Sequence, residues 1–150
     1  MELPVYITVE EVRRVCKALD IRDWTCLDKV EVSEDEAGMI LANTDTAGLK
    51  IPLEDFRAGL EVELEHGTMY PAANVTNNHP LLTARIVVAH LLETMDYYKR
   101  LEVAELEGDL HKALVSGQHQ KAANYYRRLL AARQVLVAAE KDSLGSSNPS

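Results

Sequence analysis

The stretch IVVAHLL, residues 86–92, decides the fold class of this chain. Only His90 interrupts its apolar side chains, which would cover nearly the whole circumference of a helix. Helical periodicity continues on both sides, so we expect one long helix over residues 81–107 that runs through the middle of the fold. Gly108 and Asp109 then predict a break or a kink.

Three further helices surround this segment in the sequence. Apolar side chains at helical spacing predict them over residues 8–20, 52–66 and 118–141. Thr8 is a suitable N-cap for the first of these helices, and Gly67 is a suitable C-terminal stop for the second.

Residues 28–50 have a weaker pattern. Ser33 and Glu36 have the spacing of a capping box, which favours a short helix followed by a loop. Val30 and Val32 alternate with charged residues, so a small hairpin remains the alternative. We therefore predict an all-α fold, a bundle of about four main helices with an irregular insertion near residues 28–50.

The composition bounds the class of protein. The chain has 150 residues, of which 47% are apolar and 27% charged, so it can bury a core. We predict a single helical domain over residues 1–142 and a flexible polar tail over residues 143–150. With 16 basic and 24 acidic residues the net charge is −8, which repels phosphate backbones, so we expect no nucleic-acid partner.

The sequence also bounds the compartment. No apolar run approaches the roughly 20 residues that span a bilayer, so we expect no membrane partner. The chain does not open with a basic segment followed by an apolar stretch, as a secretory signal would. Cys16 and Cys26 suit reduced thiols better than a disulfide framework. These features predict a cytoplasmic protein.

Metal-ligating side chains occur on the second predicted helix, residues 52–66. Glu63-x-x-His66 is an i, i+3 pair that presents a carboxylate and an imidazole on one helix face, beside the apolar stripe. Glu61 and Glu65 fall on the opposite, solvated side. The Glu-x-x-His spacing is the one that di-metal four-helix proteins use.

The third predicted helix carries the reverse spacing, His90-x-x-Glu93. If the two helices are antiparallel neighbours, His66 faces His90 and Glu63 faces Glu93, and four ligands converge. Tyr97 lies on the same face of a continuous helix and would donate a hydrogen bond to a ligand.

An ionised glutamate in an apolar interior costs several kcal/mol unless it is paired or coordinated. A divalent cation would offset the charge of both carboxylates, and this mixture of nitrogen and oxygen ligands suits Zn, Fe or Mn. A buried network of His–Glu hydrogen bonds without an ion is the alternative.

Three stretches carry a family resemblance: LEDFRAGLEVELEHG (53–67), NVTNNHPLLTARIVVAHLLE (74–93) and DYYKRLE (96–102). They resemble a family of small uncharacterised bacterial and phage proteins, classed as a domain of unknown function. The Glu-Leu-Glu-His-Gly and Ala-His-x-x-Glu-x-x-Asp-Tyr-Tyr motifs are its most distinctive parts. The chain departs from that pattern at residues 28–50, which look like an insertion, and at His79, where the family tends to carry an acid. The resemblance implies no activity.

Two functional hypotheses follow. The first is a metal-binding helical-bundle protein with a Glu/His site between two antiparallel helices. The second is a metal-free interaction or assembly protein, a homo-oligomer, because the helix over residues 118–141 has a broad apolar face. No Ser-His-Asp set, Gly-rich phosphate loop or activated cysteine is evident in the sequence, and whether the protein is an enzyme stays open.

Overall fold

The computed structural model describes residues 7–27 and 29–146, and this part of the chain is helical. It contains six α-helices, two 3₁₀ turns and no strands, which confirms the all-α class. The elements in chain order are α1 (Val9–Ala18), η1 (Trp24–Cys26), α2 (Glu34–Ala42), α3 (Leu53–Met69), η2 (Pro71–Ala73), α4 (Pro80–Glu93), α5 (Tyr97–Val115) and α6 (His119–Ser146).

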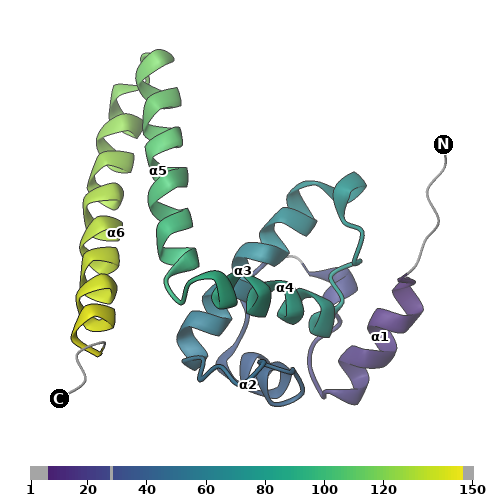
Figure 1. Cartoon of the computed structure of the whole chain (residues 1–150). Coiled ribbons are helices and arrows are strands. Elements are labelled where there is room, and N and C mark those ends of the chain that lie inside the picture. Colours follow the sequence, from purple (N-terminus) through teal and green to yellow (C-terminus); the bar gives the residue numbers. More distant parts are fainter. Residues whose placement is uncertain (1–6, 28, 147–150) are drawn as a thin grey trace. The chain divides into compact units, whose positions relative to one another are not determined.

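The helices form two compact units, residues 1–95 and residues 96–150. The first holds α1 to α4, and the second is a hairpin of α5 and α6 (Figure 1). Each is described by itself below. The single domain predicted over residues 1–142 stays a prediction.

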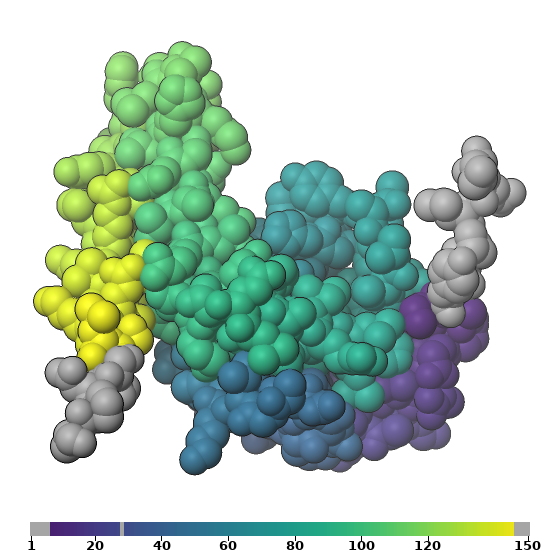
Figure 2. All heavy atoms as spheres, in the orientation of Figure 1, coloured from purple at the N-terminus to yellow at the C-terminus, as the bar shows by residue number. Residues whose placement is uncertain are grey.

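The first unit is built around Trp24, which is fully buried. Apolar side chains from all four helices are buried in the same unit, because each helix turns one stripe inward. The side chains that are fully or almost fully buried include Val12 and Cys16 from α1, Ile40 from α2, Phe56, Leu60 and Leu64 from α3, and Val87 and Leu91 from α4. α2 lies against α4 (Figure 2). Burial of this kind contributes about 25 cal/mol per Å² of apolar surface.

The segment near residues 28–50, expected to be an irregular insertion, contains α2, so the short helix is confirmed and the hairpin is wrong for the described residues. Ser33 is the N-cap of α2. Its hydroxyl accepts from the Glu36 amide, and the Glu36 carboxylate accepts from the Ser33 amide in return. This capping box places Glu36 at the start of the helix with its side chain buried.

The long helix predicted over residues 81–107 is wrong, because the chain breaks between α4 and α5. Thr94 is extended, with φ −161° and ψ 137°, and it ends α4. Gly108, where a break was expected, lies inside α5. The described residues therefore form six helices instead of about four. The apolar run in α4 is also less enclosed than expected, since Leu92 is 53% exposed.

The second unit pairs α5 with α6 in opposite directions (Figure 1). Gly117 makes the turn, with a positive φ of 66° that suits glycine. Leu106, Leu129 and Ala132 form the centre of the packing. Three partly buried side chains surround them: Val103, Leu110 and Tyr125.

The last helix extends beyond its predicted end at residue 141, because α6 continues to Ser146. The rest of the predicted tail, residues 147–150, lies outside the described residues. None of the helices in the described part of the chain is both long enough and apolar enough to cross a membrane.

Candidate functional site

Glu63 on α3 and His90 on α4 lie next to each other in the first unit. His90 Nε2 is 3.6 Å from Glu63 Oε1, and the two side chains are 29% and 17% exposed. At this distance the pair attract each other if the imidazole is protonated. Two of the four predicted ligands are therefore brought together from separate helices, one imidazole and one carboxylate.

The other two predicted ligands, His66 and Glu93, are exposed. The predicted register placed His66 opposite His90, whereas the observed contact places Glu63 there. The contact on α3 has thus moved by three residues, or almost one helical turn. Within the described residues, no group of three or more His, Cys, Asp and Glu side chains could hold a metal ion.

Tyr97, expected to support the site, belongs to α5 and hence to the second unit. Its ring contacts that of Tyr98 edge to face, with centroids 5.2 Å apart. The break at Thr94 removes the continuous helix on which Tyr97 shared a face with His90. The assignment of Glu63, His66, His90 and Glu93 as ligands of Zn, Fe or Mn stays a prediction.

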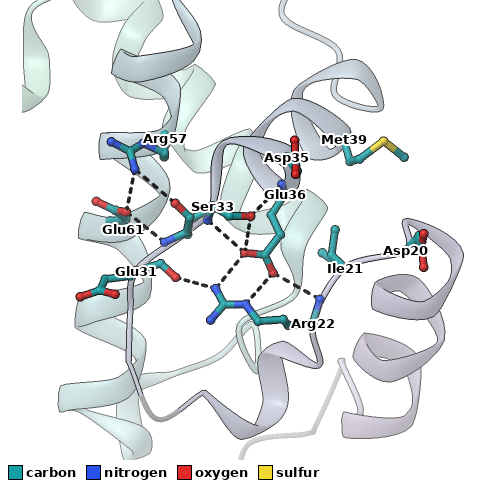
Figure 3. Close-up of a pocket in the computed structure, with 11 residues that line it drawn as sticks. Asp20, Ile21, Arg22, Glu31, Ser33, Asp35, Glu36, Met39, Arg57 and Glu61 are labelled. Atoms are coloured by element: carbon teal, nitrogen blue, oxygen red, sulfur yellow. Dashed lines mark hydrogen bonds and ion pairs between the residues drawn. The ribbon is translucent and has the colours of Figure 1, made fainter.

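A more extensive polar network lies elsewhere in the first unit, around an open pocket of about 660 Å³ (Figure 3). Five carboxylates and two guanidinium groups line it, together with Ile21, Val32, Ser33 and Met39. The charged groups are Asp20, Glu31, Asp35, Glu36, Glu61, Arg22 and Arg57.

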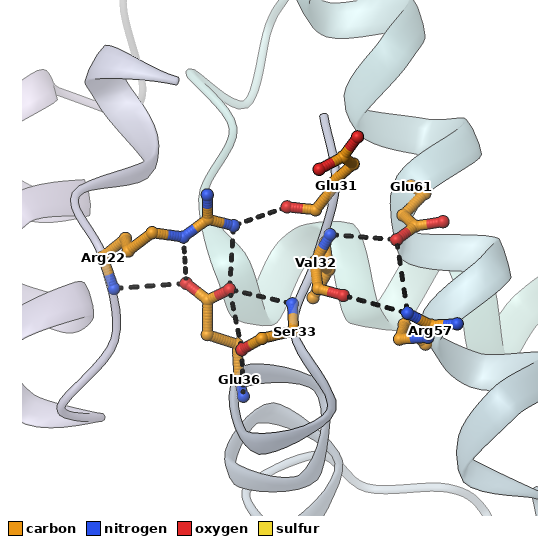
Figure 4. Close-up of polar contacts among 7 residues, drawn as sticks. All are labelled: Arg22, Glu31, Val32, Ser33, Glu36, Arg57 and Glu61. Carbon is orange, nitrogen blue, oxygen red and sulfur yellow. Dashed lines mark hydrogen bonds and ion pairs between the residues drawn. The ribbon is translucent and has the colours of Figure 1, made fainter. Parts of the chain in front are cut away.

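Glu36 is the centre of this network and is only 6% exposed. Arg22 donates to both of its carboxylate oxygens, with Nε–Oε1 and Nη2–Oε2 distances of 2.8 Å each (Figure 4). The backbone amides of Arg22 and Ser33 add bonds of 3.2 and 3.1 Å. Burial raises the pKa of Glu36, but these donors outweigh it and lower the pKa to about 2 from an ordinary 4.5.

Glu61 was expected on the solvated side of its helix, but its carboxylate binds the backbone of Val32. Its Oε1 accepts from the Val32 amide at 2.9 Å and lies 4.0 Å from Arg57 Nη1. Arg57 in turn donates to the Val32 carbonyl at 3.5 Å. Two side chains of α3 thus hold both polar backbone groups of Val32 (Figure 4). The arginines are engaged by protein groups, which makes this network a means of fixing residues 31–33 in place.

Gly67, expected to end its helix, instead lies inside α3, which continues to Met69. A Cβ at this position would come within 2.4 Å of Asn78 Oδ1. Asn74 donates to the Gly67 carbonyl at 3.2 Å and to Asn78 Oδ1 at 2.8 Å. The glycine of the Glu-Leu-Glu-His-Gly motif therefore allows the loop before α4 to pack closely on α3.

His79 caps α4, with Nδ1 accepting from the Leu82 amide at 3.4 Å. The side chain is buried, and burial lowers the pKa of its imidazole against the opposing effect of the Glu11 carboxylate. A neutral imidazole offers the acceptor that an N-cap needs. An acidic side chain offers the same acceptor, which explains in physical terms why either residue type suits this position.

The family model described as a protein of unknown function, DUF5661, matches residues 12–107. The matched range contains α2, α3, α4, Glu63 and His90, and it ends before α6 begins. No curated protein and no solved structure shows significant similarity to the chain. Because the match covers well over half of its 150 residues, the chain belongs to the DUF5661 family of proteins of unknown function.

Proposed function

We propose that this protein is an assembly protein that works as a homo-oligomer and needs no metal. One observation carries the proposal: α6 has a second apolar stripe beside the one that packs on α5. The residues of this outer stripe are Tyr126, Leu130, Val137 and Leu144, and they are 43–74% exposed. Monomeric proteins seldom expose contiguous apolar surface without a use for it.

The inner packing of the hairpin supports the same proposal. Buried apolar side chains in the second unit are few, and three of them are alanines: Tyr98, Leu106, Ala113, Ala122, Leu129 and Ala132. Most of the stability of a helix in a protein comes from packing of its apolar face. Covering the outer stripe would therefore add to the stability of a hairpin that has few large buried side chains of its own.

Size-exclusion chromatography with light scattering on the full chain tests this proposal. We expect the wild-type chain to have an oligomeric mass and Leu130→Glu to have the monomeric mass, because a buried unpaired charge opposes association. Val115→Glu is the matched control, since Val115 is an exposed apolar residue of the same unit outside the outer stripe. It should leave the mass unchanged. A monomeric wild-type chain would refute the proposal, and so would equal effects of the two variants.

Metal binding at Glu63 and His90 is the second candidate function. It is favoured by the 3.6 Å approach of a carboxylate and an imidazole from two helices. Two protein ligands would leave the remaining coordination positions of Zn, Fe or Mn to water or to groups from another copy.

Elemental analysis of protein purified without a nickel column tests this second candidate. This candidate requires near-stoichiometric metal that is lost in His90→Ala and kept in the control His111→Ala, because His111 is exposed on the other unit. Metal-free wild-type protein would rule the candidate out, as would metal that His90→Ala retains.

A further inference from the structure

The outer stripe of α6 borders an open groove of about 440 Å³. The groove is lined along a single helix by Leu130, Arg133, Gln134, Val137, Ala138 and Lys141. These positions form two consecutive sets spaced i, i+3, i+4 and i+7: 130, 133, 134, 137 and then 134, 137, 138, 141. Four residues at that spacing are the hole that receives one side chain of a facing helix in a coiled coil.

A facing helix fills such holes only if its apolar side chains recur along one face. The outer stripe of α6 is such a face. Tyr126, Leu130 and Val137 lie within an arc of about 40° on a helix of 100° per residue. They are all exposed, and Leu130 and Val137 also line the groove. One helix thus carries both the holes and the side chains suited to them, which is the requirement for self-complementary pairing about a two-fold axis.

Building on the assembly function proposed above, we infer that the groove binds α6 of a second copy, in the antiparallel direction. Leu130 of each copy enters the hole formed by Gln134, Val137, Ala138 and Lys141 of the other. Because the two contacts are related by the two-fold axis, the helices cross next to Gln134. The two hairpins then form a four-helix assembly, the arrangement in which pairs of helices bury a common core.

The charges on α6 select the antiparallel direction. Its first half, residues 119–133, carries four basic residues and no carboxylate, namely Lys121, Arg127, Arg128 and Arg133. Its second half, residues 134–146, carries two carboxylates and one basic residue near its end, Glu140, Asp142 and Lys141, so it is weakly acidic where the first half is strongly basic. Antiparallel pairing brings the basic half of one copy beside the acidic end of the other, whereas parallel pairing sets the basic halves side by side. Like charges held close together oppose association.

Two of these charges are already paired within the hairpin, so the choice of direction rests mainly on three basic residues in the first half of α6, Lys121, Arg127 and Arg128. Arg133 Nη2 lies 2.6 Å from Glu107 Oε1, and Glu140 Oε1 lies 2.8 Å from Arg100 Nη2. Both pairs join α5 to α6 within one chain. Arg133 can therefore border the groove with its charge balanced by a neighbour instead of unpaired.

Single-cysteine crosslinking on the full chain tests the inferred register. In a Cys26→Ser background, which removes the exposed native thiol, Gln134→Cys places the new thiol at the crossing point. A disulfide needs Cβ atoms about 4 Å apart, so it reports this geometry. Ala123→Cys is the matched control, since Ala123 is an exposed residue on the same face of α6. The antiparallel register separates its two copies by about 33 Å at 1.5 Å per residue.

We expect mild oxidation to produce the covalent dimer of Gln134→Cys at least about tenfold faster than that of Ala123→Cys, because the bound copies hold the two thiols together. A light-scattering mass on each variant separates the outcomes. An oligomer in which the control crosslinks as fast or faster would refute the antiparallel register and leave the assembly function standing. A monomer would refute both, and it would be the result if the groove were covered by another part of the same chain or by a different protein.

Discussion

Replacing Glu36 by Gln removes the charge that the polar network of the first unit is built to hold. The pKa of Glu36 is about 2 in the folded chain and 4.5 ordinarily. The ionised carboxylate is therefore more stable in the folded chain than in the unfolded chain, and its ionisation favours folding. At pH 7 the shift corresponds to about 3 kcal/mol of unfolding free energy. Because the folded pKa is depressed, this stabilisation is complete above pH 4.5 and is lost as the pH falls toward 2. Glutamine keeps the capping-box spacing but cannot carry the charge.

Urea unfolding followed by the fluorescence of Trp24 measures this effect, since Trp24 is the chain's one tryptophan and is fully buried in the first unit. We expect Glu36→Gln to lower the unfolding free energy by about 3 kcal/mol at pH 7, and about 2 kcal/mol of this difference to vanish by pH 3. Glu31→Gln is the control, because Glu31 lines the same pocket with an exposed side chain, and it should change little at either pH. A Glu36→Gln difference that is the same at pH 7 and pH 3 would refute the reasoning.

Two further predictions concern the first unit, and Trp24 fluorescence reports both. Gly67→Ala should lower the unfolding free energy by about 1–3 kcal/mol, because its Cβ would meet Asn78 at 2.4 Å. Gly38→Ala, in a helix position with open space, should instead raise it by up to about 1 kcal/mol, and equal signs for the two glycines would contradict the close approach. Burial lowers the pKa of His79 from 6.5, so between pH 7 and pH 5 the unfolded wild-type chain binds a proton that the folded chain does not. The unfolding free energy of the wild type therefore falls as the pH falls through this range. That of His79→Asn, which lacks the imidazole, should fall less. An unchanged pH profile would contradict the burial of a neutral imidazole.

The all-α fold class and most helix positions could be predicted from the sequence, because apolar periodicity and capping depend on residues that are close in the sequence. The stripe in α3 and the capping box at Ser33 both led to helices that exist. The break at Thr94 could not be predicted, since residues 94–96 contain neither Gly nor Pro and the apolar pattern continues across them. Gly67 shows the opposite error, because a glycine that looks like a helix stop serves a close contact with a distant loop.

The candidate site could be predicted only in part, because its contacts join residues that are distant in the sequence. Side-chain spacing identified Glu63 and His90 as inward-facing, and they do meet. The register between α3 and α4 depends on how two apolar faces pack, and a change of three residues left His66 and Glu93 exposed. Glu61 was missed because its partner, the Val32 backbone, lies 29 residues away in the sequence.

The solution mass of the full chain is the decisive measurement for the assembly proposal. One chain has a mass of 16.7 kDa. In sedimentation equilibrium we expect twice that mass at high concentration, with dissociation on dilution, as pairing of two α6 helices requires. A mass of 16.7 kDa that persists from low to high micromolar concentration would show that the outer stripe of α6 does not join two copies.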